Sequence, residues 1–188
     1  MSFDHNDHYH RLLLRQIPAH ATTALDVGCG TGRFARVLAG RGLAVEAMDP
    51  VLEGAHGDGV RFVKADAATA ELGRYDFISC LASLHHMPFE TVARFRDALN
   101  PGGVLAVLGC YRESTAGDYA TALVASPVNA VIRVALSGRQ GPEVSAPVRQ
   151  PDVPLPEIRA RAAALLPGSR VRRLLLWRYL LTFTTRTP

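Results

Sequence analysis

Thr23-Ala-Leu-Asp-Val-Gly-Cys-Gly-Thr-Gly-Arg-Phe-Ala35 is the stretch that decides the fold. Its apolar start, residues 24–27, indicates a buried strand; glycines follow at positions 28, 30 and 32, and residues 33–39 have helical character. A strand, a glycine-rich turn and a helix in this order form the first unit of a nucleotide-binding α/β fold. Glycine suits the turn because a cofactor can approach the backbone closely only where no Cβ intervenes. The start of the helix adds free N–H groups and a positive dipole end.

The spacing of the glycines separates this turn from a dinucleotide-binding one. A dinucleotide fingerprint would place its third glycine at position 33, where this chain has Arg33, and this disfavours a nucleotide-dependent oxidoreductase. The acidic Asp26 also precedes the first glycine. The string Leu25-Asp26-Val27-Gly28-Cys29-Gly30-Thr31-Gly32 resembles the cofactor motif of the class I S-adenosylmethionine-dependent methyltransferases, of the bacterial small-molecule type.

The resemblance continues downstream in the order expected of that family. Residues 22–27, 43–48, 60–64, 75–81 and 104–109 are predicted strands, residues 89–99 a helix, residues 100–103 a turn, and residues 171–176 and 179–184 a closing pair of strands. The resemblance implies a Rossmann-like three-layer α/β sandwich whose seven-stranded sheet is mostly parallel with an antiparallel strand 7. The length of 188 residues favours a single domain spanning residues 1–188.

The same resemblance implies that S-adenosylmethionine lies across the carboxyl ends of the first, second and fourth strands. It assigns the methionine moiety to Asp26, Gly28 and Gly30, with Arg33 either pairing with the methionine carboxylate or exposed. The expected cofactor-binding residues are Asp26, Gly28, Cys29, Gly30, Arg33, Asp49, Pro50, Asp66, Ala67, Leu81 and His86.

Two acidic residues at strand ends carry the nucleoside part of this assignment. Asp49 closes the second strand, where an acid can accept hydrogen bonds from both ribose hydroxyls. Asp66, followed by Ala67, resembles the adenine-binding position, with the carboxylate accepting from the adenine amino group and the Ala67 backbone donating. The alternative interpretation is that Asp66 caps the next turn.

His85 and His86 are the candidate catalytic residues because they follow the fourth strand, near the expected reacting centre. Methyl transfer needs a base only when the acceptor is an undissociated hydroxyl, a protonated amine or an acidic carbon, and imidazole has a suitable pKa. Alternatively, one histidine packs against adenine or caps the following helix. The segment Ser83-Leu-His-His-Met87 resembles small-molecule methyltransferases. The predicted reaction is methyl transfer to an O, N or C nucleophile of a small organic molecule; the alternative is a catalytically silent S-adenosylmethionine-binding protein acting through a partner.

Composition gives few signs of other partners. The net charge is +4, Lys64 is the only lysine, and the arginine cluster at residues 170–178 indicates a solvated strand face more than a nucleic-acid surface.

The three cysteines lack C-x-x-C spacing, which predicts buried thiols and no metal. With no apolar run of about 20 residues and a polar start, neither a membrane span nor a signal peptide is expected, and a cytoplasmic location is predicted.

Three segments depart from the regular pattern. Residues 1–20 are expected to form an N-terminal helix, over residues 8–16, that folds over the active site, with Tyr9 or His10 as lining candidates. Residues 111–156, with further helical character over 119–136, are expected to line the acceptor pocket. The connection over residues 51–59 is short and glycine-rich, so one side of the sheet would be thinly covered. A partner chain would cover it, and a homodimer is left open.

Overall fold

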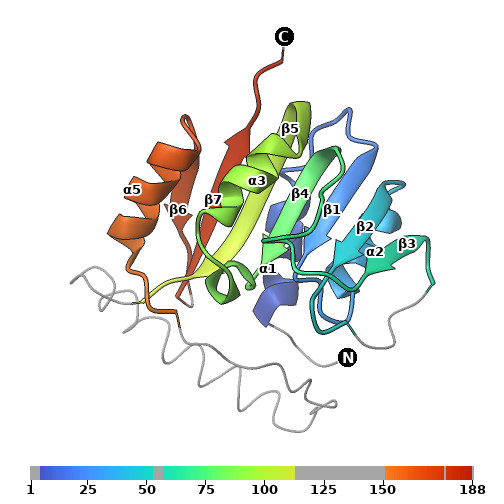
Figure 1. Ribbon diagram of the computed structural model, residues 1–188, viewed down its shortest axis with the longest axis horizontal. Coiled ribbons are helices and arrows are strands. Elements are labelled where there is room, and N and C mark those ends of the chain that lie inside the picture. Colours follow the sequence, from blue (N-terminus) through green and yellow to red (C-terminus); the bar gives the residue numbers. More distant parts are fainter. Residues whose placement is uncertain (1–4, 53–56, 113–150, 176, 188) are drawn as a thin grey trace, which may run out of the picture.

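Residues 5–52, 57–112, 151–175 and 177–187 are described by the computed structural model. Within them, one seven-stranded sheet contains β1 (Thr23–Val27), β2 (Ala44–Met48), β3 (Val60–Val63), β4 (Tyr75–Leu81), β5 (Leu99–Cys110), β6 (Arg170–Arg173) and β7 (Arg178–Thr184). Their order is β3-β2-β1-β4-β5-β7-β6 (Figure 1). The strands from β3 to β5 pair in parallel, and β7 is antiparallel to both of its neighbours. The predicted fold class is confirmed.

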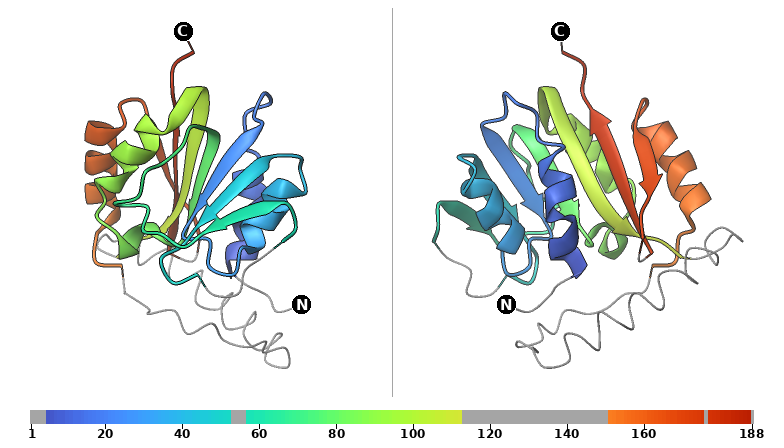
Figure 2. Two further views of the ribbon diagram at one scale, coloured as in Figure 1. Left: turned by 45° about the vertical axis from the view of Figure 1, so that its right-hand side comes forward. Right: turned by 180° about the vertical axis from the view of Figure 1, so that it is seen from behind.

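Helices cover both faces of this sheet (Figure 2). The helices are α1 (His5–Leu14), α2 (Arg33–Ala39), α3 (Thr91–Asp97), α5 (Leu155–Leu165) and the 3-10 turn η1 (Leu84–His86). Alternation along β1 explains the two cores: Ala24 faces the core that contains α1 and α2, whereas Leu25 and Val27 face the core that contains α3 and α5. Each fully buried leucine or phenylalanine contributes about 1.5–3 kcal/mol to folding.

The N-terminal helix is part of the fold on the α2 side of the sheet. It spans His5–Leu14, whereas the sequence predicted residues 8–16. Tyr9 is buried and its hydroxyl donates to the Leu175 carbonyl at 2.8 Å. The His10 ring packs against Phe34, with 4.8 Å between ring centroids. These contacts hold α1 against the body of the protein.

Two predicted boundaries are wrong for local reasons. The helix expected over residues 89–99 is limited to Thr91–Asp97, because the chain forms a turn first, in which the Thr91 N–H donates to the Pro88 carbonyl. The turn expected at residues 100–103 is incorporated into β5, which begins at Leu99. Leu99 already pairs with Tyr75, and the register then shifts before Phe77.

Two further expectations concern segments that the structure describes only in part. The helical character over residues 119–136 and most of the 111–156 insertion lie outside the described residues. In the connection over residues 51–59, the described residues 51–52 and 57–59 contain no helix.

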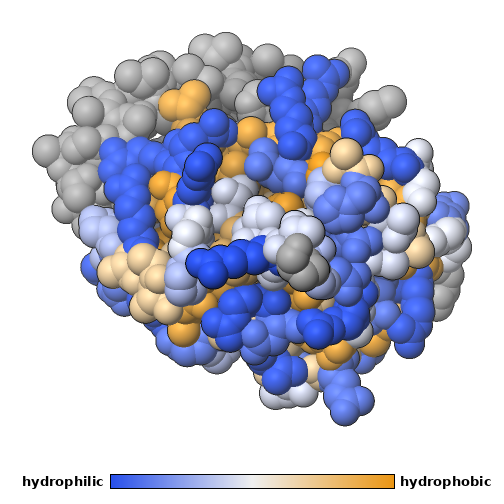
Figure 3. Space-filling model, turned by 90° about the horizontal axis from the view of Figure 1, so that it is seen from above, coloured by the Kyte–Doolittle hydropathy of each residue, from blue (hydrophilic) through white to orange (hydrophobic). Residues whose placement is uncertain are grey.

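The end of the molecule where the parallel strands begin is predominantly hydrophilic, with scattered apolar side chains (Figure 3). In the described part of the chain, no helix is long and apolar enough to cross a membrane.

Asp76 holds together the starts of β1, β4 and β5. Its Oδ2 accepts the backbone N–H groups of Thr22 and Thr23 at 2.9 and 3.1 Å and both threonine hydroxyls at 3.0 and 3.1 Å. Its Oδ1 accepts from the Asn100 amide at 2.7 Å. Although burial raises the pKa of Asp76, the hydrogen bonds from Asn100 and the two threonines hold it below its usual range.

We predict that Asp76→Ala lowers the free energy of unfolding at pH 7 by about 2–4 kcal/mol, because it removes five hydrogen bonds to a charged acceptor. Urea denaturation measures this loss. Since the folded-state pKa lies below the unfolded value of 3.8, the contribution is present above about pH 4 and is lost as the pH falls through the folded pKa.

The matched control is Asp97→Ala, which removes an exposed carboxylate paired with Arg96 at 2.8 Å and should cost less than about 1 kcal/mol. Equal losses in the two variants would contradict the role given to Asp76.

Candidate functional site

The glycine turn lies against the end of β2. The N–H groups of Gly28 and Cys29 donate to the Met48 carbonyl at 2.8 and 3.2 Å. Gly28 has a φ of +66°, and a Cβ there would lie 2.2 Å from the Ser83 Oγ. Gly30 has a φ of +53°, but a Cβ on it would meet no atom within 4 Å. Gly28 is therefore required by close packing, whereas Gly30 presents bare backbone to open space.

Asp49 ties this turn to the second strand. It is 7% exposed. Its Oδ2 accepts from the Gly30 N–H and its Oδ1 from the Val51 N–H, each at 2.9 Å. A carboxylate oxygen can accept more than one hydrogen bond. Both oxygens therefore retain capacity toward two further hydroxyl donors.

Ser83 connects the turn to the end of β4. Ala82 is one of few non-glycine residues with a positive φ, +52°, and its N–H donates to the Leu108 carbonyl at 2.7 Å. The Ser83 hydroxyl lies 3.1 Å from the Gly28 carbonyl and 2.8 Å from the Leu81 carbonyl, and can donate to either. This strained corner directs the chain into η1, which carries both histidines.

A cavity of about 390 Å³ lies at the carboxyl ends of β1, β2 and β4. Of the predicted cofactor residues, seven line it: Gly28, Gly30, Asp49, Pro50, Asp66, Ala67 and His86. The remaining described lining residues were not identified from the sequence: Val27, Met48, Val51, Ala65, Ala82, Ser83 and Met87. Most of these directly flank a predicted residue at a strand end, so their positions followed from the strand assignments.

The residues around this cavity suit S-adenosylmethionine in type. The bare Gly30 backbone leaves room along the turn, Asp49 offers two acceptor oxygens, and apolar side chains such as Met48 form the walls. A mostly apolar cavity with a few placed polar groups is typical of small-molecule sites.

Asp66 shows the turn-capping contacts that were one of its two interpretations from the sequence. Its Oδ1 accepts from the Ala68 N–H at 2.9 Å, and its backbone carbonyl accepts from Thr69 and Ala70. It therefore caps the following turn. It is also exposed on the cavity lining beside the buried Ala67, so its second oxygen is available to a ligand.

Four predicted residues lie outside the cavity lining. Arg33 is the exposed first residue of α2, and Leu81 packs, half-buried, with the α1 and α2 core. Cys29 is half-buried within the turn. Asp26 is 2% exposed and lies behind the turn. Phe34 and Leu38, four residues apart, form the buried face of α2 and leave Arg33 on its exposed side, the second of the two positions expected for this residue.

Asp26 is a buried acid with few hydrogen-bond donors. Its Oδ1 accepts from the Ser79 hydroxyl at 2.8 Å, and the Ala35 N–H also donates to it. Burial raises the pKa of Asp26 to about 7, the two hydrogen bonds oppose this rise, and the nearby Asp49 charge adds to it. Asp26 therefore changes its charge near neutral pH.

The three cysteines are reduced and poorly nucleophilic. Burial, together with the charges of Asp26 and Asp49, raises the pKa of Cys29 to about 12. Burial likewise raises the pKa of Cys80 to about 12 and that of Cys110 above its usual range. Among the described residues, no three His, Cys, Asp or Glu side chains gather as a metal site requires.

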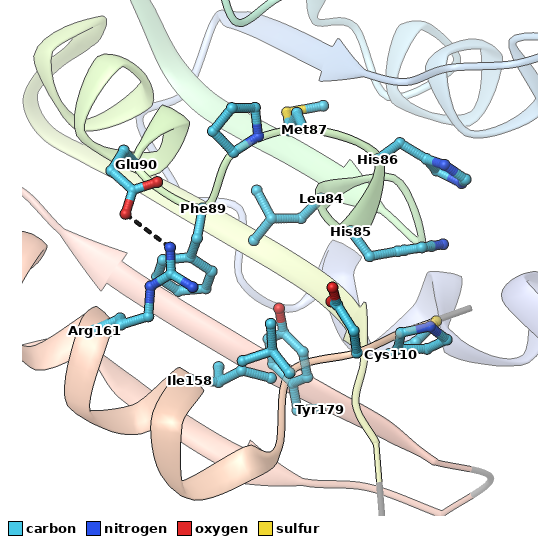
Figure 4. Close-up of a pocket in the computed structure, with 14 residues that line it drawn as sticks. Leu84, His85, His86, Met87, Phe89, Glu90, Cys110, Ile158, Arg161 and Tyr179 are labelled. Atoms are coloured by element: carbon cyan, nitrogen blue, oxygen red, sulfur yellow. Dashed lines mark hydrogen bonds and ion pairs between the residues drawn. The ribbon is translucent and has the colours of Figure 1, made fainter. Parts of the chain in front are cut away.

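A second cavity, of about 330 Å³, adjoins the first (Figure 4). Its described lining is Leu84, His85, His86, Met87, Pro88, Phe89, Glu90, Cys110, Pro151, Asp152, Val153, Ile158, Arg161 and Tyr179. His86 and Met87 line both cavities, whereas His85 lines only the second. The two histidine rings lie 4.0 Å apart between centroids. Sequence reasoning missed the contributions of α5 and β7, which no local motif marks.

One wall of the second cavity has a fixed polar arrangement. The Arg161 Nη2 donates to the Glu90 Oε1 at 2.7 Å, and its guanidinium lies 4.9 Å from the centre of the Phe89 ring. Tyr9 and His10, expected as lining candidates, are absent from the described lining of both cavities.

Comparison with known proteins gives a consistent result. A family model described as a methyltransferase domain matches residues 5–136. An uncharacterised methyltransferase of Mycobacterium tuberculosis is 36% identical over 192 residues, covering 95% of this chain and 94% of that protein.

Solved methyltransferase structures share the fold. The magnesium protoporphyrin IX methyltransferase of Synechocystis, with bound S-adenosylhomocysteine, matches with a TM-score of 0.58 and 17% identity over 95% of this chain and 80% of its own. The 1,6-didemethyltoxoflavin N1-methyltransferase of Burkholderia thailandensis matches with a TM-score of 0.58 and 21% identity over 95% and 78%.

We predict a pH-dependent stability difference between wild type and Asp26→Asn. Because the folded-state pKa of about 7 lies above the unfolded value of 3.8, the folded wild type binds the proton more tightly. Its stability therefore falls relative to the non-titrating variant as the pH rises from 4 to 7, by about 3 kcal/mol.

Urea denaturation at several pH values measures this difference. Asp97→Asn, at an exposed position, is the control and should follow the wild type. A constant gap between wild type and Asp26→Asn from pH 4 to 8 would contradict the assignment.

Proposed function

Because the chain belongs to the class I S-adenosylmethionine-dependent methyltransferases, we propose that it transfers the sulfonium methyl group to an O, N or C nucleophile of a small organic molecule. The observation that carries this proposal is the sharing of His86 and Met87 by two adjoining cavities. One cavity has the residues of a cofactor site, and the other is enclosed by different elements. A methyl group and its acceptor would meet where the cavities join.

We assign the cofactor to the cavity at the ends of β1, β2 and β4. Asp49 would accept the ribose hydroxyls through the capacity left on its two oxygens. Asp66 and Ala67 would hold adenine, and the bare backbone of Gly28 and Gly30 the methionine moiety. When bound, the cofactor supplies an electrophilic methyl group on a positively charged sulfur.

Asp26 would influence the cofactor site without lining it, from behind the glycine turn. Its contacts with Ser79 and Ala35 join β4 and α2 to β1, and its negative charge favours the cationic amino group of the methionine moiety across the glycine backbone. Arg33, Cys29 and Leu81 would then contribute through the shape of the turn and strand ends.

His86 is the candidate proton acceptor, since it lines the cavities of both substrates. A positioned base contributes about 10²–10⁴-fold to a reaction that removes a proton. His85 lines only the second cavity, and its ring packs, tilted by 40°, against that of His86, which would restrict the orientation of the His86 ring. Besides removing the proton, the protein would hold the acceptor in line with the methyl group and exclude water.

A small acceptor is supported by the size of the second cavity, about 330 Å³, which is lined by residues of η1, β5, α5 and β7. The structural relatives named above are methyltransferases of magnesium protoporphyrin IX and of 1,6-didemethyltoxoflavin, which are small molecules. We also propose that the chain is a single domain, since every described strand belongs to one sheet.

We predict that Asp49→Ala weakens S-adenosylhomocysteine binding about 5- to 150-fold, because it removes the acceptor from the ribose and frees the Gly30 N–H. Calorimetric titration with S-adenosylmethionine and S-adenosylhomocysteine measures the effect. The control is Asp58→Ala, whose carboxylate is exposed and pairs with Arg36 at 2.8 Å. A folded wild type that binds neither ligand at millimolar concentration would contradict the proposed cofactor site.

We predict that His86→Asn lowers kcat about 10²–10⁴-fold with a protonated acceptor, while His85→Asn has a smaller effect. The measurement is release of S-adenosylhomocysteine with acceptors found by screening small hydroxylated and keto compounds. Tight cofactor binding without turnover on any acceptor would favour the catalytically silent alternative.

A further inference from the structure

Tyr179 is a buried polar residue at the floor of the second cavity. It lies near the start of β7, where it pairs with Gly109 of β5, and is 2% exposed. A Cβ on Gly109 would lie 2.2 Å from the Tyr179 ring. The absence of a side chain at position 109 therefore lets the ring lie across β5, and Figure 4 shows its hydroxyl directed into the cavity.

The Tyr179 hydroxyl differs from that of another buried tyrosine in its hydrogen bonding. The Tyr9 hydroxyl donates to the Leu175 carbonyl at 2.8 Å. Within the described part of the chain, by contrast, no group hydrogen-bonds to the hydroxyl of Tyr179. A buried hydroxyl normally forms a hydrogen bond with protein, water or ligand. We therefore expect a hydrogen-bond partner for this hydroxyl inside the cavity.

The Tyr179 hydroxyl acts as a donor. Burial, with smaller effects from Cys80 and Cys110, raises the pKa of Tyr179 far above its usual value. The group therefore stays protonated, and its complement in a ligand is an oxygen or nitrogen with an available lone pair.

The other lining residues of the second cavity indicate which type of ligand would carry the accepting oxygen or nitrogen. Leu84, Met87, Phe89 and Ile158 provide apolar walls. The charge of Arg161 is balanced by Glu90 at 2.7 Å and Glu157 at 3.6 Å, and Asp152 adds another carboxylate to the lining. Among the described lining residues, the guanidinium of Arg161 is therefore already paired with carboxylates, so it does not favour an anionic ligand over a neutral one.

We propose that Tyr179 is a substrate-recognition residue, and that the acceptor is a neutral, largely apolar molecule whose carbonyl or hydroxyl oxygen accepts a hydrogen bond from the Tyr179 hydroxyl. The inference rests on the proposed function, because it takes the second cavity as the acceptor site. It places the recognised oxygen at the β7 side and the methylated atom at the His86 side of one molecule.

The test compares two probes, 1-indanone and indane, which share a ring skeleton and differ by one carbonyl oxygen. The titrations contain no methyl donor, so neither probe can be methylated and binding is measured without turnover. Their dissociation constants are determined by NMR titration of the full chain, with and without saturating S-adenosylhomocysteine, for wild type and Tyr179→Phe. The variant keeps the ring over Gly109 and removes only the hydroxyl.

We expect Tyr179→Phe to weaken 1-indanone about five- to tenfold, as for the loss of one hydrogen bond, and to leave indane within about twofold. The matched control is Tyr75→Phe, at a buried tyrosine that lines neither cavity; the affinities of both probes should be unchanged. Equal shifts of both probes in Tyr179→Phe would overturn the inference.

The wild type alone provides a second check that does not depend on a variant folding. We expect it to bind 1-indanone at least as tightly as indane, although the ketone is the better hydrated molecule. Preference for indane, or binding of neither probe by protein that binds S-adenosylhomocysteine, would overturn the inference and leave the proposed function standing. Failure of S-adenosylhomocysteine itself to bind would instead contradict the proposed function.

Discussion

The parallel register of β2, β1 and β4 is the constraint on which the rest of the site depends. It places Val27 opposite Met48 and Cys80, so the segments that follow all three strands emerge at one edge. Backbone hydrogen bonds from the glycine turn to Met48 and the Asp49 carboxylate then fix the turn against β2. The first cavity is the space that these strand ends leave between them, and its carboxylates, Asp49 and Asp66, already accept backbone hydrogen bonds within the fold.

The acceptor cavity depends on a different and more distant contact, the antiparallel pairing of β5 with β7. That pairing brings Gly109 opposite Tyr179 and closes the cavity on the side away from the cofactor. The strained Ala82 and the Ser83 hydroxyl turn the chain at the end of β4 so that η1 lies between the two cavities. The first cavity is thus lined from the ends of β1, β2 and β4, the second from β5, β7 and α5, and η1 contributes to both.

Two buried aspartates, Asp76 and Asp26, show that the number of hydrogen-bond donors around a carboxylate decides the direction of its pKa shift. Asp76 receives five donors from the strand starts, which outweigh burial and keep it ionised. Asp26 is more fully buried and receives few donors, so burial raises its pKa to about 7. Asp76 links three strands at the end of the sheet that is remote from the cavities. Asp26 lies behind the glycine turn, so the charge of the site changes near neutral pH.

The sequence by itself determined the fold class and most of the cofactor cavity. The alternation of apolar residues, the glycine turn and acids such as Asp49 and Asp66 at strand ends are local features, and parallel pairing brings strand ends together whatever the detailed packing. Only the tertiary structure decided that Asp26 lies behind the cavity and that Asp76 joins three strands. It alone placed Tyr179 and Arg161 on the cavity that the histidines line, because these segments are about 75 to 95 residues apart and no local pattern encodes their register and helix placement.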